Sequence, residues 1–247
     1  MAMKEPGRFT PENRPLRAVI YGDPGVGKTT LALTFPRPFV INTDFGLEGD
    51  AVAGRTDLIV AEPRGYREFE DVTKWMVAHR DDFDTIVLDS FDGAATLLLN
   101  EVVDQGAANA GGSLLKEVVP ETQEYLGNQK QMERIINTFR RFDKHIVMTG
   151  GVRQPEGKKR SLNAAPGLLQ IVDRWTSLMG EVVVVRLGPD GSITKDGTPT
   201  RMLMIDPSSK NRECKTRWSA LLPYVEEPTF DKLWAAASAV PDIKESK

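Results

Sequence analysis

The chain has few of the residues that define several large classes of protein. Its 247 residues include one cysteine, Cys214, and two histidines. A single cysteine cannot form an internal disulfide framework or supply a cysteine-rich zinc site. No apolar run reaches the ~20 residues that a membrane-spanning helix needs, and the N-terminal residues lack the apolar core of a signal peptide. These absences favour a protein of the reducing cytoplasm, with no membrane partner.

An excess of charge of either sign is also missing. Lysine and arginine total 32 residues against 35 aspartates and glutamates, and the formal net charge is −3. This balance excludes a protein that binds nucleic acid over its whole surface, although a local basic groove stays possible. The composition, 40% hydrophobic and 27% charged, is that of an ordinary globular protein. The length fits one α/β domain with a small extension.

What the sequence does contain is a phosphate-binding pattern near its start. Residues 22–30 read GDPGVGKTT and match G-x-x-x-x-G-K-[ST], with a strand-like run before them and helical spacing after them. Glycines let backbone N–H groups turn inward around phosphates. The lysine then reaches the β- and γ-phosphates, and the threonine hydroxyl holds Mg²⁺. We therefore predict an ATP and Mg²⁺ site formed by Gly22, Asp23, Pro24, Gly25, Val26, Gly27, Lys28, Thr29 and Thr30.

Strand and helix patterns alternate along most of the chain, which predicts an α/β fold with a mostly parallel sheet covered by helices. The expected strands are residues 16–21, 39–43, 58–61, 85–89, 145–149, 181–187 and 201–206. The expected helices are residues 28–35, 66–79, 93–103, 122–142 and 230–240. The last two strands read as an antiparallel hairpin with its turn at 189–191. The predicted organisation is an N-terminal arm at 1–15, a core at 16–223, and a C-terminal helix and tail at 224–247.

Acidic residues follow two of the predicted strands. Asp89 ends the buried run FDTIVLDS, and the carboxyl end of such a strand lies beside a P-loop, where an aspartate can hold Mg²⁺. The alternative is that Asp89 only caps the next helix. Asp44 follows the strand at 39–43 and is our first candidate for positioning the attacking water, with Glu48 as the second. Both could instead be solvated loop residues.

Two segments interrupt the alternation. Residues 104–112 are small and glycine-rich, and residues 152–166 are polar and basic. Basic side chains in a loop can neutralise nucleic-acid phosphates, but this loop has no aromatic residue on which a base could stack. A solvated surface loop is the alternative. The predicted DNA-binding residues are Arg153, Lys158, Lys159 and Arg160.

A second basic run, at 207–217, places Lys210 and Arg212 two residues apart directly after a predicted strand. Both side chains could point to the same phosphate if this strand end met the active site of a neighbouring copy. A solvated charged face is the ordinary reading of such a run. The spacing alone leaves both interpretations open.

Taken together, these motifs resemble the RecA-like recombination ATPases reduced to their core. They are most similar to phage-encoded RecA-core proteins that anneal single-stranded DNA, within a phage nucleotide-binding AAA-type family. The residues that carry the likeness are GDPGVGKT, the Asp-Ser pair of IVLDS, the acidic position of NTD, and KNR. The resemblance spans residues 16–223. It implies a RecA-like P-loop NTPase fold, in which ATP lies between subunits of a filament or ring.

The resemblance also assigns roles. It implies that Asp44 is the catalytic carboxylate, where the family usually has glutamate, and that Asp89 is the Walker B aspartate. Lys210 and Arg212 would reach into the neighbouring subunit's ATP, and Thr149 would stand where RecA has a γ-phosphate-sensing glutamine. The segments at 104–112 and 152–166 would meet DNA. The implied partners are single-stranded DNA, further copies of the chain, and a single-stranded-DNA-binding protein.

Two other functions remain open at this point. The chain could be a different P-loop enzyme, such as a small-molecule kinase that uses residues 153–160 as a short lid. A GTPase is disfavoured because the sequence has no Asn-Lys-x-Asp motif for the base. The chain could also be a non-hydrolysing, ATP-dependent loader or partner of replication proteins. ATPase activity that rises with single-stranded DNA would favour the recombination protein.

Overall fold

The computed structural model describes residues 14–109, 120–217 and 223–238. Its centre is a nine-stranded mixed sheet with the order β11-β9-β8-β1-β5-β4-β2-β3, and β10 pairs with β8 off this path. These strands are β1 (Arg17–Tyr21), β2 (Pro38–Asn42), β3 (Ile59–Ala61), β4 (Thr85–Asp89), β5 (His145–Gly150), β8 (Leu178–Leu187), β9 (Thr198–Met204), β10 (Lys215–Thr216) and β11 (Tyr224–Glu226).

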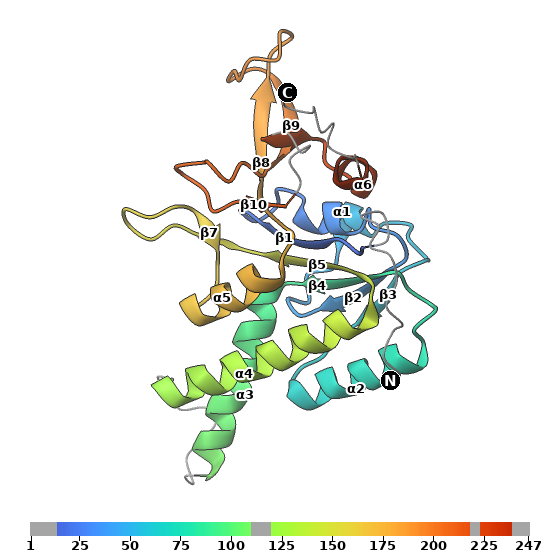
Figure 1. Ribbon diagram of the computed structural model, residues 1–247, viewed down its shortest axis with the longest axis vertical. Helices are drawn as coiled ribbons and strands as arrows, with labels where there is room; N and C mark the ends of the chain where they lie inside the picture. Colours follow the sequence, from blue (N-terminus) through green and yellow to red (C-terminus); the bar gives the residue numbers. More distant parts are fainter. Residues whose placement is uncertain (1–13, 110–119, 218–222, 239–247) are drawn as a thin grey trace, which may run out of the picture.

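Helices cover both faces of the sheet (Figure 1). One face carries α2 (Tyr66–Ala78), α3 (Phe91–Asn109), α4 (Thr122–Phe139) and α5 (Pro166–Trp175), and the other carries α1 (Lys28–Ala32) and α6 (Phe230–Ser238). Short 3₁₀ turns occur at η2 (Gly49–Ala51) and η3 (Arg140–Phe142). The sheet is therefore the middle layer of three.

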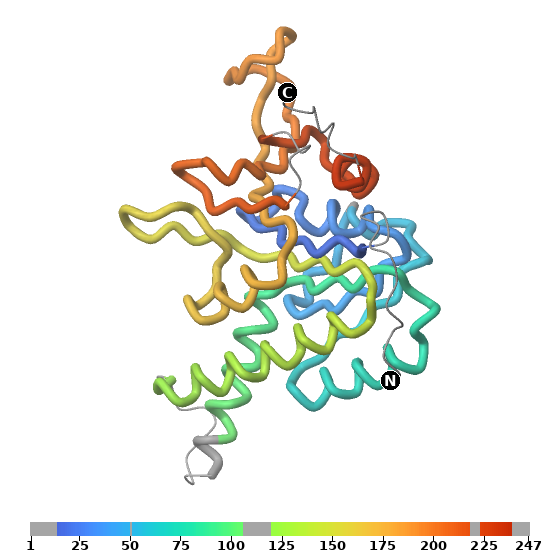
Figure 2. Tube along the Cα trace, in the orientation of Figure 1, coloured from blue at the N-terminus to red at the C-terminus, as the bar shows by residue number. Residues whose placement is uncertain are grey.

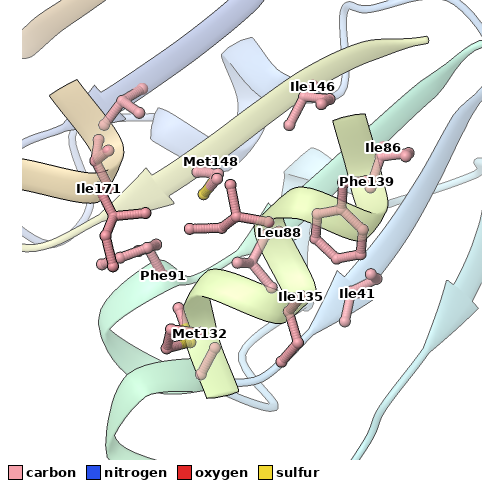
Figure 3. Close-up of a cluster of buried hydrophobic side chains, with 14 of the residues drawn as sticks. Ile41, Ile86, Leu88, Phe91, Met132, Ile135, Phe139, Ile146, Met148 and Ile171 are labelled. Carbon is pink, nitrogen blue, oxygen red and sulfur yellow. The ribbon is translucent and has the colours of Figure 1, made fainter. Parts of the chain in front are cut away.

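Alternation along the strands explains why two separate cores form. In β1, Val19 and Tyr21 join the core under the α2–α5 face, while Ala18 and Ile20 join the core under α1 and α6. Successive strand residues point to opposite faces, so a buried central strand is apolar throughout. Figure 3 shows the larger core, where Met132 of α4 packs near Leu88 of β4. Fully burying each such side chain contributes about 1.5–3 kcal/mol.

The strand order brings four strand ends to one edge. β1 lies between β5 and β8 and is parallel to both, and β5, β4 and β2 continue the parallel run. Carboxyl ends of parallel strands meet at one edge, where ligands bind in open α/β sheets. β8 continues past its pairing with β1 and turns back as β9, which is antiparallel to it. This hairpin stands beyond the edge, next to the loop that follows β1 (Figure 1).

The structure confirms the predicted α/β class, with a mostly parallel sheet and a C-terminal antiparallel hairpin. The predicted break at 104–112 is wrong in its described part, because α3 runs on to Asn109. Alanine and glutamine in this stretch are good helix formers, and one glycine costs only ~1 kcal/mol. Residues 110–112 lie outside the described ranges.

Helix α5 was not among the expected elements, although the sequence carries its signals. Pro166 is at the start of the helix, and Leu168, Ile171, Val172 and Trp175 are buried at helical spacing. Proline is favoured in the first helical turn because its missing N–H would be unpaired there anyway. Our sequence interpretation assigned the polar residues up to Pro166 to a loop and did not extend the search for a helix beyond them.

The chain ends of the described part also pack on the sheet. β11 pairs with β9, and α6 contributes Leu233 to the core on its face, with Phe230 and Trp234 packed against it. Of the predicted N-terminal arm, residues 1–13 lie outside the described ranges. Within those ranges, the structure has no helix with the length and apolarity required to cross a membrane.

Candidate active site

Residues 22–27 form the loop between β1 and α1 at the carboxyl edge of the sheet, and Lys28 and Thr29 begin α1. Gly22, Gly25 and Gly27 have φ angles of 157°, 77° and 91°, which side chains with a Cβ rarely adopt. A Cβ at Gly22 would also lie 2.5 Å from the carbonyl oxygen of Val182 in β8. Asp23 and Pro24 are exposed at the loop tip. The glycines thus give the backbone the curl that presents N–H groups to phosphate.

The side chain of Lys28 lies across this loop. Its Nζ donates to the carbonyl oxygens of Gly22, at 3.1 Å, and Asp23, at 2.9 Å. Burial lowers the pKa of Lys28, and nearby carboxylates oppose this change, in the order Asp89, Asp92, Asp23 and Asp44. Lys28 is therefore a positive charge that several carboxylates of this edge help to maintain.

Asp89, at the end of β4, is buried and holds two hydroxyl groups. Thr29 donates its Oγ1 proton to Asp89 Oδ2 at 2.8 Å, and Thr149 donates to the other carboxylate oxygen. The neighbouring strands β4 and β5 supply Asp89 and Thr149, while α1 supplies Thr29. The predicted metal pair and the predicted γ-phosphate sensor are thus brought together.

This arrangement fits Mg²⁺. The Thr29 hydroxyl and the Asp89 carboxylate give oxygen ligands only, which Mg²⁺ prefers. Among the residues that the structure describes, no group of three or more His, Cys, Asp or Glu side chains could hold a metal. Mg²⁺ usually binds one or two protein groups together with waters and substrate phosphates, so a larger protein cage is not needed.

Asp44 follows β2 and lies at the same edge as Lys28 and Asp89. Burial raises the pKa of Asp44, the Asp92 and Asp89 charges add to the rise, and hydrogen bonding to Ser90 and the charge of Lys28 oppose it. A Cβ added at Gly93 would collide with the Asp44 carboxylate, so glycine at 93 makes room for it. Asp44 and Glu48 are both exposed, and Glu48 precedes the η2 turn. Of the two candidates, Asp44 is the one among the carboxylates around Lys28.

Asp92 is a site residue that our sequence interpretation missed. It lies in the first turn of α3, and the Gly151 N–H, directly after β5, donates to its two carboxylate oxygens at 3.2 Å each. Its spacing of three residues after Asp89 was the available signal, because the first turn of a helix after a strand stays at the strand's edge. Asp92 joins that helix to the start of the basic segment.

A buried glutamate holds the two basic segments together, and one of its arginine partners also contacts the loop. Glu181 is fully buried in β8, beside Tyr21 in the sheet register. Its Oε1 lies 2.7 Å from Arg160 Nε, and its Oε2 makes a close ion pair, 2.6 Å long, with Arg212 Nε. Arg160 also reaches Asp23 in the phosphate loop, with 2.9 Å between Nη2 and Oδ2. We call these four residues the Glu181 cluster.

Replacing Glu181 by glutamine is expected to destabilise the fold by about 3 kcal/mol, the lower end for a broken buried pair, because two guanidinium groups lose their shared anion. The unfolding temperature should fall by roughly 6–12 °C, as measured by circular dichroism. The matched control is Asp57→Asn, whose carboxylate pairs with Arg55 at the surface and should leave the unfolding temperature unchanged. Equal unfolding temperatures for Glu181→Gln and the wild type would show that the cluster does not hold these segments.

The basic segments themselves pair side by side. Residues 152–162 form a small hairpin of β6 (Val152–Arg153) and β7 (Ser161–Leu162). The Arg160 N–H donates to the Asn211 carbonyl oxygen and the Glu213 N–H donates to the Arg160 carbonyl oxygen, both at 2.8 Å. Figure 2 shows the two segments projecting on the same side of the chain trace. The predicted DNA residues and the predicted Lys210–Arg212 pair are therefore neighbours.

Their side chains differ in availability. Lys158 and Lys210 are exposed, while Arg153 and Lys159 are half-buried, and Arg153 lies near the Ser161 hydroxyl. Arg160 and Arg212 are engaged in the Glu181 cluster. The structure does not test the DNA or neighbour roles of these residues, which stay predictions.

A parallel sheet, a glycine-rich phosphate loop and a strand-end aspartate that holds the loop threonine define a P-loop nucleotide-binding fold. A family model described as an AAA domain matches residues 14–217, most of the chain. The chain belongs to this AAA-domain family, a class of nucleotide-binding ATPases. No curated protein matches its sequence.

Proposed function

We propose that the chain is a RecA-like protein that hydrolyses ATP and acts on single-stranded DNA in recombination or annealing. We further propose that copies assemble so that ATP lies between subunits. One observation carries the DNA part: two basic segments, distant in sequence, pair with each other, share Glu181 as an ion-pair partner, and are joined through Arg160 to Asp23 of the phosphate loop. A charged surface coupled to a nucleotide site is what an ATP-regulated nucleic-acid protein needs.

The proposed DNA-binding surface consists of Arg153, Lys158 and Lys159. Lys158 is exposed, so it can meet phosphates without giving up an internal contact. Arg160 instead links this surface to Asp23. DNA held by Lys158 and Lys159 would therefore lie one or two residues from a direct contact with the phosphate loop. That contact is the physical route by which DNA could change the geometry of the ATP site.

The positions of the site residues support the following route of hydrolysis. Thr29 and Asp89 would hold Mg²⁺, which would supply positive charge to neutralise the phosphates. Lys28 would leave the Gly22 and Asp23 carbonyls for the phosphate oxygens. Asp44 would accept the proton from the attacking water as the new P–O bond forms and the bond to the β-phosphate oxygen breaks, giving ADP and phosphate. Thr149, on Asp89, is placed to register loss of the γ-phosphate.

The contribution of a neighbouring subunit falls best on Lys210. Arg212 is tied to buried Glu181 of its own chain, and removing it would leave a buried carboxylate with one partner fewer, which is costly. Lys210 is exposed two residues earlier. A cation supplied in trans can stabilise the charge of the phosphoryl-transfer transition state.

Single-stranded DNA should bind the ATP-loaded protein with a salt dependence that Lys158→Ala weakens. Each neutralised phosphate on a single strand contributes about 0.7 to the slope of log K against log salt. The slope for Lys158→Ala should thus be shallower by about 0.7, as measured by fluorescence anisotropy at several salt concentrations. Lys74→Ala, which removes an exposed lysine of α2 that pairs with Asp71, should keep the wild-type slope.

Equal slopes for Lys158→Ala and Lys74→Ala would remove the 152–166 segment from the DNA surface. Wild-type protein that hydrolyses ATP but binds no single-stranded DNA would overturn the DNA proposal. Phosphate transfer to a small molecule would then identify a kinase instead.

A further inference from the structure

The side chain of Arg201 lies against the phosphate loop from the side of β9. Its Nε donates to the carbonyl oxygen of Val26 at 3.2 Å. A Cβ added at Gly27 would lie 2.6 Å from its Cζ and 2.8 Å from its Nη2, so the guanidinium would have to move if another residue replaced Gly27. Gly27 thus serves two purposes, since its φ angle of 91° is also left-handed. Arg201 is thus a third cation at the loop, besides Lys28 and Arg160.

The backbone holds Arg201 firmly in this place. It pairs with Val184 in the β8–β9 register. Glu227 accepts the Arg201 N–H on its Oε1 at 2.7 Å and donates its own N–H to the Arg201 carbonyl oxygen at 2.8 Å. Within the described part of the chain, the guanidinium has no carboxylate partner, and its Nη atoms have no hydrogen-bond acceptor. Its remaining donors are therefore available to a ligand.

The strand order gives the direction in which a nucleotide would lie. Asp89, Thr149 and Asp44 come from or follow β4, β5 and β2, all on one side of β1. Arg201 comes from β9, on the other side of β1. The γ-phosphate must lie near the metal pair and the water-positioning carboxylate, so the rest of the phosphate chain runs towards β8 and β9. Arg201 is thus at the nucleoside end.

We propose that Arg201 binds the α-phosphate end of the nucleotide, opposite Lys28, which binds the β- and γ-phosphates. This inference rests on the proposed ATP binding and adds a residue that the P-loop pattern does not contain. Guanidinium groups form paired, charge-assisted hydrogen bonds to phosphate oxygens. ATP and ADP share the α-phosphate, so the contact should serve both equally and should not change during hydrolysis.

The test compares Arg201→Gln with Arg186→Gln in the full chain. Arg186 is an exposed arginine of the same hairpin, bonded to the Gly197 carbonyl oxygen. Titration with fluorescent ATP and ADP should show both affinities lowered about 10- to 100-fold in Arg201→Gln, the range for a lost charged hydrogen bond. Arg186→Gln should match the wild type. The KM for ATP should rise by the same factor with kcat unchanged, which marks equal binding of ground and transition states.

Arg201→Lys keeps the charge and should recover part of the affinity, and the unfolding temperature without nucleotide should match the wild type in both variants. A purely structural role would instead lower kcat and the unfolding temperature. If the wild type binds ATP and Arg201→Gln binds ATP and ADP with the same affinities, this inference is wrong and the proposed function stands. The same holds if Arg201→Gln loses affinity for ATP but not for ADP. Absence of ATP binding by the wild type would overturn the proposed function as well.

Discussion

Replacing Lys28 by alanine is expected to lower ATP hydrolysis by at least about 100-fold, the loss seen when one preorganised donor to a developing negative charge is removed. The charges of Asp89, Asp92, Asp23 and Asp44 all favour the charged form of Lys28. Without it, the triphosphate would enter a site that holds several carboxylates and has lost its central positive charge. ATP affinity, measured by titration with fluorescent ATP, should fall together with the steady-state rate.

The matched control is Lys74→Ala, which removes an exposed lysine paired with Asp71 on α2. It should leave both ATP affinity and the hydrolysis rate unchanged. Unfolding curves of the two variants would show whether Lys28→Ala remains folded. A folded Lys28→Ala protein with wild-type ATP affinity would mean that the loop after β1 is not the nucleotide site.

Replacing Asp44 by asparagine is expected to lower hydrolysis by about 10²- to 10⁴-fold, the contribution of a positioned general base, while ATP binding is retained. Asparagine has the same shape, so it fits in the space that Gly93 leaves. Only the ability to accept a proton is lost. Single-turnover hydrolysis and equilibrium ATP binding, measured on the same preparation, separate the two effects. Retained hydrolysis would indicate that Asp44 is not the base.

The acid side of the pH–rate profile gives a second measure of Asp44. Burial raises the pKa of this carboxyl above its usual 3.8, and the protonated form cannot accept a proton from water. The rate should therefore fall as the pH drops through that raised pKa. Glu48→Gln is the matched control, since Glu48 is exposed before the η2 turn. If Glu48→Gln abolished hydrolysis and Asp44→Asn did not, the assignments would be reversed.

The parts of the site that were predictable from the sequence are those fixed by local pattern. The glycine spacing of residues 22–29 requires the loop, and apolar runs that end in an acidic residue place Asp89 and Asp44 at the carboxyl edge of the sheet. Alternating strand and helix signals were sufficient for the sheet class. The structure brings Lys28, Thr29, Asp89, Asp44 and Thr149 to that edge, and their chemical roles remain predictions.

Residues that act through distant pairings could not be predicted in this way. Arg160 looked like one of four equivalent DNA ligands, but it contacts Glu181 and Asp23, which lie 21 and 137 residues away. Glu181 was expected only as the first residue of a strand in an antiparallel hairpin, and it is fully buried. Arg201 meets the phosphate loop across 175 residues. The order of the strands in the sheet decides which arginine pairs with which carboxylate. Local hydrophobic patterns in the sequence do not reveal that order.

The Glu181 cluster provides a chain of contacts through which the proposed coupling between DNA and ATP could act. Arg160 and Arg212 hold the two basic segments on one buried carboxylate, and Arg160 alone also touches the phosphate loop. A ligand that displaces either segment must therefore move Arg160, which is bonded to Asp23, or break an ion pair with the buried Glu181 carboxylate. This connection would let DNA on the basic surface alter the placement of phosphates in the site.

The most direct test of this account is the steady-state ATPase rate of the full chain with and without single-stranded DNA, at low salt. We expect ATP hydrolysis that depends on Mg²⁺ and rises when single-stranded DNA is added. We also expect Lys28→Ala to abolish the basal rate and its stimulation together. A wild-type rate that is the same with and without DNA would contradict the proposed coupling, and no hydrolysis under either condition would contradict the proposed ATPase itself.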